Sequence, residues 1–422
     1  MEHGTADVTR LVIQLAVILA AAKVGGELCG RYLRMPSILG ELAAGIAIGP
    51  FALGGIDMPG AGPLFKDIVG EGFAIPVSEG LWAIAQVGSI VLLFAAGLET
   101  DLRQFLRYAR PATMVAAGGV ILPFLLGAAV TVLFGFADSF ADPEALFIGA
   151  VLTATSIGIT VRVLGDLRRL STPEGVTVLG AAVLDDVLAI LALTVVVGIA
   201  ATGELSPGSI GVVAAKTLGF WIALTGLGVV FSRRISAVFE GFRVSGAALA
   251  LALALAFLAA GLAEVAGLAM IIGAFSIGLA LSGTPLARQL DEPLQAVYAA
   301  LVPVFFVVMG MMVDLTSLGG VWAFGLVVTA LAIVGKVAGG GIPALLVGFN
   351  RRGAWRIGVG MLPRGEVALI MAGVGLTSGI LSSDLYGIVI IMTVITTALA
   401  PPLLSWSFRG GAHGARQRNP DD

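Results

Sequence analysis

Long apolar runs recur along the chain, and each is about as long as a helix must be to cross a membrane. A hydrocarbon core roughly 30 Å thick requires about 20 apolar residues, because a helix advances only about 1.5 Å per residue. Hydrophobic residues make up 58% of the 422 residues, and charged residues only 12%. The sequence therefore predicts an all-α polytopic membrane protein embedded in a lipid bilayer, with little polypeptide outside it.

We predict about thirteen transmembrane helices, an odd number that places the termini on opposite sides of the membrane. They cover residues 9–31, 36–52, 79–98, 109–135, 145–164, 175–201, 208–232, 244–263, 267–282, 294–313, 321–349, 354–380 and 384–408. The net charge of −3 argues against a nucleic-acid partner. The single cysteine, Cys29, excludes an internal disulfide and a cysteine-rich metal site.

Arginine is concentrated on one side of the predicted membrane. When alternate loops are assigned to the cytoplasm, the opposite loops hold only Arg10 and Lys66. The cytoplasmic set is Arg31, Arg34, Arg103, Arg107, Arg110, Arg162, Arg168, Arg169, Arg233, Arg234, Arg243, Arg288, Arg351, Arg352, Arg356, Arg409, Arg416 and Arg418. Because Lys and Arg in short loops stay in the cytoplasm, we predict a cell (inner) membrane protein with its N-terminus outside and residues 409–422 as a short cytoplasmic tail.

A few charged residues remain inside the predicted spans, where each costs about 2.5–3.5 kcal/mol at a helix centre on insertion scales. They are Lys23, Glu27, Glu41, Asp185, Asp186, Lys336, Arg364 and Glu366. Lys23 and Glu27 are four residues apart on one helix face, so we expect them to neutralise each other in a structural role.

Asp185, Asp186 and Lys336 lie near the centres of their spans and therefore at one depth. Adjacent helix positions point about 100° apart, so the two carboxylates cannot both face one partner. We expect one aspartate to pair with Lys336 and the other to face a cavity. A purely structural ion pair is the alternative, but it would explain only one aspartate.

Two spans carry residues that interrupt a helix. The segment "LTATSIGIT" contains Thr155 and Ser156, and "GVGMLPRGEVALI" contains Pro363 and Gly365. Proline removes a backbone donor, and Ser or Thr offers the backbone other hydrogen bonds. We predict that both helices are broken at the midplane, where irregular backbone is tolerated only inside protein or beside a water-filled cavity.

The two interrupted spans are separated by an odd offset along the chain, so they run antiparallel. This spacing predicts an inverted repeat formed by residues 36–201 and 267–408, in which the broken helices cross. Thr155, Ser156, Arg364 and Glu366 would then lie beside the aspartates. Arg364 and Glu366 have an alternative structural role, in which each compensates the dipole of a half-helix end.

The stretches "TATSIGIT", "GAAVLDDVLAI", "IVGKVAGGG" and "MLPRGEVALI" together resemble the motifs of NapA-type sodium/proton antiporters of the monovalent cation:proton antiporter superfamily, which have KefC-type relatives. The resemblance covers nearly the whole chain and implies an NhaA/NapA-like antiporter fold. It implies core helices at about 109–201 and 321–408, dimerisation helices at about 9–98 and 244–313, and a linking helix at about 208–232. It also implies a homodimer. In each protomer the core helices slide against the dimerisation helices.

The resemblance implies a role for each candidate site residue. Asp186 matches the aspartate that exchanges H⁺ for the transported Na⁺, and no other metal or cofactor is implied. Asp185 and Lys336 match the pair associated with electrogenic exchange. Thr155 and Ser156 match the unwound segment that lines the site, and Glu366 matches a residue of the partner helix.

The sequence thus favours a secondary active transporter, not an enzyme, which exchanges Na⁺ or Li⁺ for H⁺ in sodium and pH homeostasis. Exchange of K⁺ for H⁺ stays open, because selectivity depends on cavity size and ligand number. A cation channel fits less well, because antiparallel broken helices with a lysine counter-ion are typical of carriers. Two site carboxylates disfavour a transporter of organic anions.

Overall fold

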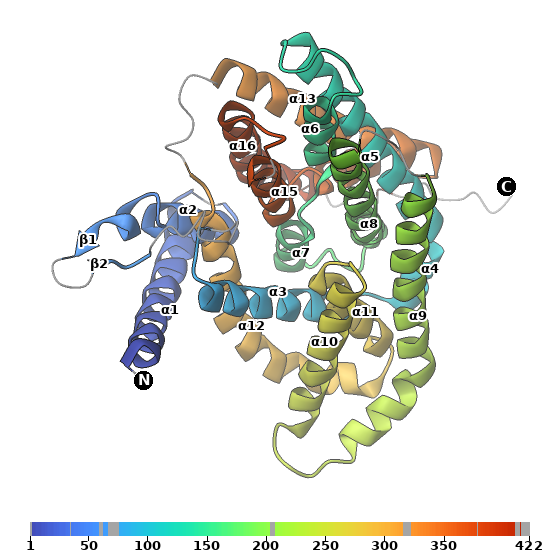
Figure 1. Ribbon diagram of the computed structural model, residues 1–422. Helices are drawn as coiled ribbons and strands as arrows, with labels where there is room; N and C mark the ends of the chain where they lie inside the picture. Colours follow the sequence, from blue (N-terminus) through green and yellow to red (C-terminus); the bar gives the residue numbers. More distant parts are fainter. Residues whose placement is uncertain are drawn as a thin grey trace, which may run out of the picture.

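The computed structural model describes residues 2–33, 35–58, 62–65, 76–202, 207–314, 322–377, 379–409 and 414. These residues are almost entirely helical, as the apolar runs predict (Figure 1). The first part of the chain holds α1 (Glu2–Leu28), a short π-helix (Cys29–Leu33), α2 (Ser37–Ile48), a 3₁₀ turn (Leu53–Gly55), α3 (Glu79–Glu99), α4 (Leu102–Arg107), α5 (Ala109–Leu133), α6 (Pro143–Thr153), α7 (Ile157–Asp166) and α8 (Pro173–Thr202). The rest holds α9 (Pro207–Glu240), α10 (Ala247–Val265), α11 (Met270–Leu281), α12 (Pro285–Met311), α13 (Trp322–Leu346), α14 (Arg351–Gly360), α15 (Glu366–Thr377) and α16 (Ser383–Phe408).

Each predicted span coincides with a helix or with two consecutive helices. Within the described ranges, 10 helices are long and apolar enough to cross a membrane, and two shorter apolar helices accompany them. Sequence reasoning missed the short helix α4 and a small hairpin of β1 (Asp57–Met58) and β2 (Gly62–Pro63). It also started α12 too late, because the charged first turns of that helix lower its hydropathy without ending it.

The helices form two groups (Figure 1). One group, here called the core bundle, contains α5–α8 and α13–α16. The other, here called the scaffold row, contains α1–α3 and α10–α12. The long helix α9 contacts α8 of the core bundle and α11 of the scaffold row.

The contacts between helices repeat when the two halves of the chain are exchanged. In the core bundle, α5 packs on α6 and α8 as α13 packs on α14 and α16. In the scaffold row, the contact of α2 with α12 corresponds to the contact of α11 with α3. The helices α5 and α13 pack on each other at Gly118 and Gly339, where a Cβ on either glycine would overlap the carbonyl oxygen of the other. This pattern agrees with the inverted repeat that the helix order predicts.

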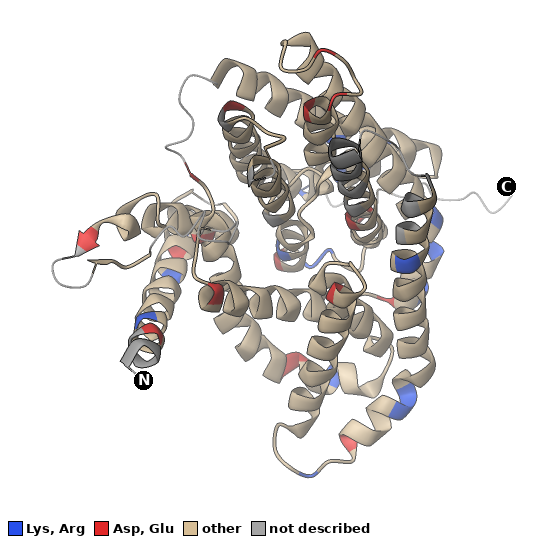
Figure 2. Ribbon diagram, in the orientation of Figure 1, with Lys and Arg blue, Asp and Glu red and all other residues tan. Residues whose placement is uncertain are grey.

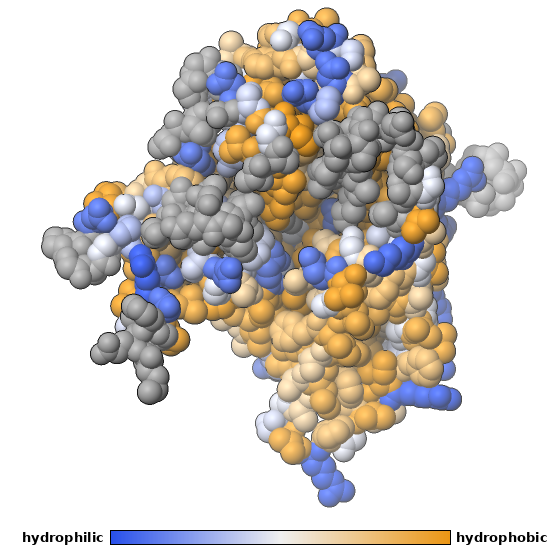
Figure 3. All heavy atoms as spheres, viewed as in Figure 1, coloured by the Kyte–Doolittle hydropathy of each residue, from blue (hydrophilic) through white to orange (hydrophobic). Residues whose placement is uncertain are grey.

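The surface matches a multi-pass membrane protein. Charged residues are sparse along the helices (Figure 2), and a broad apolar surface covers α9–α12 (Figure 3). Large apolar side chains such as Val230, Leu258 and Leu346 are more than half exposed. Such exposure is costly in water but favourable against lipid.

Two predictions about charged residues were wrong. Lys23 and Glu27 do not neutralise each other: Lys23 Nζ donates to the Ala299 carbonyl at 2.9 Å, and Glu27 lies 3.9 Å from Arg31. A neighbouring helix gives the lysine a closer acceptor than its own helix does. Arg162 and Arg356, which were counted as loop residues, lie inside α7 and α14, where acidic partners compensate their burial.

Candidate ion-binding site

The two predicted interruptions face each other at the centre of the core bundle. The helix ladder stops at residues 154–156, between α6 and α7, and again at residues 361–365, between α14 and α15. The Ser156 amide donates to the Pro363 carbonyl at 2.8 Å, and the Thr160 hydroxyl donates to the Gly360 carbonyl at 2.7 Å. Each broken helix therefore satisfies backbone groups that the other break leaves open.

Small residues allow the two segments to approach closely. A Cβ added to Gly365 would lie 2.9 Å from Ser156 Oγ and 3.0 Å from Ser156 Cβ, closer than side chains normally pack. Pro363 supplies a carbonyl acceptor but has no N–H that would need a partner. The residue types that predicted the breaks thus also explain how the breaks interlock.

Arg364 lies fully buried at the crossing, with 0% of its surface exposed. Its Nη1 donates to the carbonyl of Ala154, the residue that caps the C-terminal end of α6. Carbonyls at a helix C-terminus carry partial negative charge, so the guanidinium offsets the dipole of this half-helix. The Thr397 hydroxyl of α16 donates to the Arg364 carbonyl. The side chain of Glu366 lies outside the described residues.

Asp185 on α8 and Lys336 on α13 form an ion pair at the same depth. Lys336 Nζ donates to Asp185 Oδ1 at 2.8 Å, and neither side chain is exposed. The hydroxyl of Thr155, from the first interruption, donates to the Met361 carbonyl of the second interruption at 3.4 Å. The expected pairing of one aspartate with Lys336 is confirmed, and Asp185 is the aspartate that pairs.

Asp186 points in another direction, into a cavity of about 410 Å³. The cavity is bounded by residues of α3, α8, α10–α12, α15 and the turn between α10 and α11. Its walls are formed by Trp82, Gln86, Ser89, Asp186, Ala189, Glu264, Gly267, Leu268, Ala269, Met270, Ile271, Phe305, Val367, Ile370 and Met371. The angular offset of about 100° between adjacent helix positions accounts for the different surroundings of the two aspartates.

The cavity is displaced toward one face of the molecule. Its wall includes Trp82 in the first turn of α3 and Glu264 in the last turn of α10. The start of α3 and the end of α10 lie on the same face of the molecule. Sequence reasoning gave no role to Glu264, Gln86 or Ser89. The position of Glu264 near the end of an apolar span was the only available signal, and it did not indicate which cavity the residue would line.

The fold and this site define a class of multi-pass transporter with crossed, interrupted helices beside a cavity-facing carboxylate. The family model described as "Sodium/hydrogen exchanger, transmembrane" matches residues 16–410. This chain therefore belongs to the sodium/hydrogen exchanger family.

Similar proteins match over nearly the full length. The Na(+)/H(+)-K(+) antiporter GerN of Bacillus cereus is 36% identical over 396 residues, which are 94% of this chain and 95% of that protein. The high-affinity Na(+)/H(+) antiporter NhaS3 of Synechocystis is 37% identical over 423 residues, covering 95% and 90% of the two chains. The solved structure of the sodium proton antiporter MjNhaP1 from Methanocaldococcus jannaschii has the same fold, with a TM-score of 0.66 and 17% identity over 96% of this chain and 98% of that one.

Proposed function

We propose that the protein is a secondary active transporter that exchanges Na⁺ or Li⁺ for H⁺ at Asp186. The observation that carries this proposal is a buried carboxylate, only 3% exposed, at the wall of a large cavity inside a membrane protein. Oxygen ligands suit hard monovalent cations, and a carboxylate also accepts a proton. The names of similar proteins, which are Na(+)/H(+) antiporters, support the same activity.

The exchange follows from competition for one carboxylate. Burial makes a bare negative charge on Asp186 costly, so the side chain is stable when it holds either a proton or a cation. If the site opens to the two sides of the membrane in turn, a proton taken up on one side is replaced by a cation on the other. The proton gradient then drives cation movement, which serves sodium and pH homeostasis.

Alternating access is assigned to movement of the core bundle against the scaffold row. Part of the boundary between them is lined by apolar side chains of α2, α12, α15 and α16 around a cavity of about 120 Å³. Apolar contacts have no preferred direction, so they permit sliding at lower cost than hydrogen bonds do. In this proposal the present structure is open toward the face where α3 begins, which the arginine distribution predicts to be the outside.

The Asp185–Lys336 pair gives the exchanger a second titratable unit. A cation bound at Asp186 would draw on Asp185 as a further oxygen ligand and leave the Lys336 ammonium buried without its partner. An unpaired buried ammonium is strongly disfavoured, so Lys336 would release its proton. Two protons would then move for each cation, and exchange would be electrogenic. Thr155 and Ser156 would supply further oxygens, and Glu366 stays a candidate ligand.

Proton flux in proteoliposomes tests the proposal. Na⁺, Li⁺ and K⁺ are supplied in turn, and internal pH is followed with a trapped dye in the parent and in Asp186→Asn. Asp186→Asn should abolish cation-dependent proton movement, whereas Glu79→Gln, an exposed acid at the start of α3, should retain it. Retention of exchange by Asp186→Asn contradicts the proposal. A response to K⁺ would favour the second candidate function, which the name of GerN suggests.

We also propose a homodimer in the cell membrane, with dimer contacts on the scaffold row. Its support is the resemblance of the sequence motifs. Crosslinking in native membranes followed by mass determination tests it, and a crosslinked species at the mass of one chain alone contradicts it.

A further inference from the structure

We infer that Arg162 is a positioning residue for the transport cycle. It holds the core bundle in one position against the scaffold row while Asp186 faces its cavity. The inference rests on the proposed exchange for its meaning, but its geometry is independent of the transported ion. It concerns charged residues that the ion site itself does not use.

Arg162 lies on α7 and contacts two helices of the scaffold row. Its Nη2 is 3.5 Å from Glu41 Oε1 and 3.4 Å from Ser37 Oγ, both on α2. Its guanidinium carbon lies 5.3 Å from the ring centroid of Tyr298 on α12, within the range of a cation–π interaction. On its own helix, Arg162 Nε is 3.4 Å from Asp166 Oδ2.

The Arg162–Glu41 pair is largely removed from water, whereas Asp166 stays exposed. The side chains of Arg162 and Glu41 are only 12% and 3% exposed, and Glu41 Oε2 is buried without a hydrogen-bond partner. Breaking such a pair leaves an uncompensated buried charge, which is strongly disfavoured unless water or a new partner reaches it. The contact therefore stabilises one relative position of the two groups.

Arg162 is rigidly connected to the ion site. It lies in the half-helix α7, and Ser156, which caps the start of that helix, and Thr160 in its first turn both hydrogen-bond to the segment around Pro363. Any displacement of the crossing displaces Arg162 as well. Of the ion pairs between described residues, Arg162–Glu41 is the one that joins the core bundle to the scaffold row.

The cluster and the Asp186 cavity lie toward opposite faces. Glu41 and Ser37 are in the first turns of α2, whereas the cavity includes residues near the start of α3, the next helix along the chain. Because α2 crosses the molecule before α3 begins, its first turns lie at the opposite face. The Arg162 cluster thus closes one side while the cavity opens to the other.

Between these two features the boundary is apolar. Leu42, Ile46 and Phe306 face Ile159 and Leu369 around the small cavity there. These contacts change little when one group slides past the other, because they are not directional. The polar cluster therefore selects the position, and movement that exposes Asp186 to the other face has to separate Arg162 from Glu41.

Labelling of a cysteine in the cavity tests this inference without requiring transport. In a Cys29→Ser background, Gln86→Cys places a thiol on the wall of the Asp186 cavity. A membrane-impermeant maleimide is applied to one side of sealed vesicles, and the rate is compared among the parent, Arg162→Glu, Glu41→Arg and the double reversal. Either single reversal sets like charges against each other and should slow labelling from the open side about five- to fifty-fold. The double reversal should restore the parent rate.

Two further variants keep the test decisive. Arg162→Gln removes the charge without adding repulsion, so it should have a smaller effect in the same direction. Arg31→Glu reverses an arginine of the short π-helix whose 3.9 Å pair is with Glu27 of the adjoining α1 and does not reach the core bundle, so it should leave labelling unchanged.

Unchanged labelling in both Arg162→Glu and Arg162→Gln overturns the inference, and so does a double reversal that remains as slow as the single ones. If the parent shows no cation-dependent proton exchange but labelling follows this pattern, the proposed function fails and the positioning role of Arg162 stands.

Discussion

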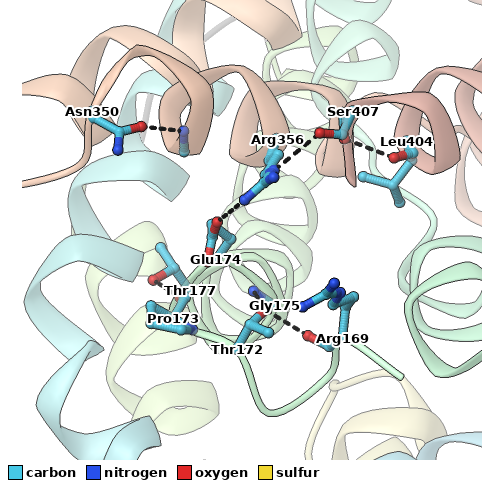
Figure 4. A network of polar contacts seen from close by, with 11 residues as sticks. Arg169, Thr172, Pro173, Glu174, Gly175, Thr177, Asn350, Arg356, Leu404 and Ser407 are labelled. Atoms are coloured by element: carbon cyan, nitrogen blue, oxygen red, sulfur yellow. Dashed lines mark hydrogen bonds and ion pairs between the residues drawn. The ribbon is translucent and has the colours of Figure 1, made fainter. Parts of the chain in front are cut away.

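Helix α8 carries two buried ion pairs of nearly equal length, and their surroundings differ. Near its start, Glu174 Oε1 lies 2.7 Å from Arg356 Nη1 of α14 (Figure 4). About three turns further along, Asp185 Oδ1 lies 2.8 Å from Lys336 Nζ of α13. Both pairs join the first half of the chain to the second.

The Glu174–Arg356 pair has additional stabilising partners. Arg356 Nε donates to the Ser407 carbonyl at 3.1 Å, and its guanidinium carbon lies 4.6 Å from the Phe408 ring centroid. Glu174 lies in the first turn of α8, where the helix dipole favours a carboxylate. This pair is suited to hold the core bundle together in every state of transport.

The Asp185–Lys336 pair lies in mid-helix, so the dipole of a helix end does not stabilise its charges. It has instead a second carboxylate, Asp186, as its neighbour in the chain, and a broken helix beside it. An ion entering there competes with Lys336 for the carboxylate. The comparison teaches that burial and ion-pair length do not distinguish a structural pair from a functional one, whereas the surroundings do.

The largest expected effect is on the free energy of unfolding, and it should come from breaking the Glu174–Arg356 pair. Arg356→Met should lower the free energy of unfolding by about 3–5 kcal/mol, because it leaves the Glu174 carboxylate buried and unpaired. Thermal unfolding in detergent measures it, with Arg351→Met, an exposed arginine of the same helix, as a control that changes little. Exchange per folded molecule should stay near the parent rate. A large loss of exchange by well-folded Arg356→Met would remove the distinction between the pairs.

Lys336→Gln tests the other side of the comparison. It should slow exchange by about tenfold or more, equivalent to about 1.4 kcal/mol, and remove the response of exchange to membrane potential. Proteoliposomes with an imposed K⁺ diffusion potential measure both effects. A variant that keeps the voltage response would show that Lys336 carries no transported proton.

An effect on stability smaller than that of Arg356→Met is expected at the crossing of the broken helices. Gly365→Ala pushes a methyl group against Ser156 and should cost about 1–3 kcal/mol through overpacking. Gly261→Ala on α10, where nothing lies within 4 Å of the added methyl, should be neutral or slightly stabilising. Unfolding midpoints of the two variants provide the comparison. Equal midpoints would mean that the crossing can relax at little cost.

The smallest effect concerns a carboxylate outside the membrane. The Ser139 hydroxyl, together with the amides of Ser139 and Asp138, donates to Asp142 and lowers the pKa of that carboxyl below its usual 3.8. Its stabilising effect is therefore present above pH 3.8 and is lost as the pH falls below that value. Asp142→Asn should lower the unfolding temperature slightly at pH 7 and by less at pH 3, where more of the carboxyl is protonated. An equal loss at both pH values would contradict the ionic contribution.

Much of the site could be predicted from local sequence. Hydropathy located the helices. The breaks were located by Pro363, Gly365 and the hydroxyl residues. The mid-span position of Lys336 indicated that its partner is an aspartate at the same depth. The exact start of α12 was not predictable in this way, because a helix continues beyond the membrane when its charged turns stay solvated. The roles of Arg162 and Arg356 were also missed, because a loop arginine and a buried arginine near a helix end look alike in sequence.

The sequence by itself determined that this chain crosses the membrane many times, breaks two antiparallel helices at mid-depth and places charges there, since each of these depends on residues close together in the chain. Only the tertiary structure decided that Asp185 pairs with Lys336 while Asp186 faces the cavity, and that Arg162 pairs with Glu41. Such choices depend on which helices become neighbours and how each is rotated about its axis. Residues 151 positions apart pair here, and local periodicity does not encode that contact.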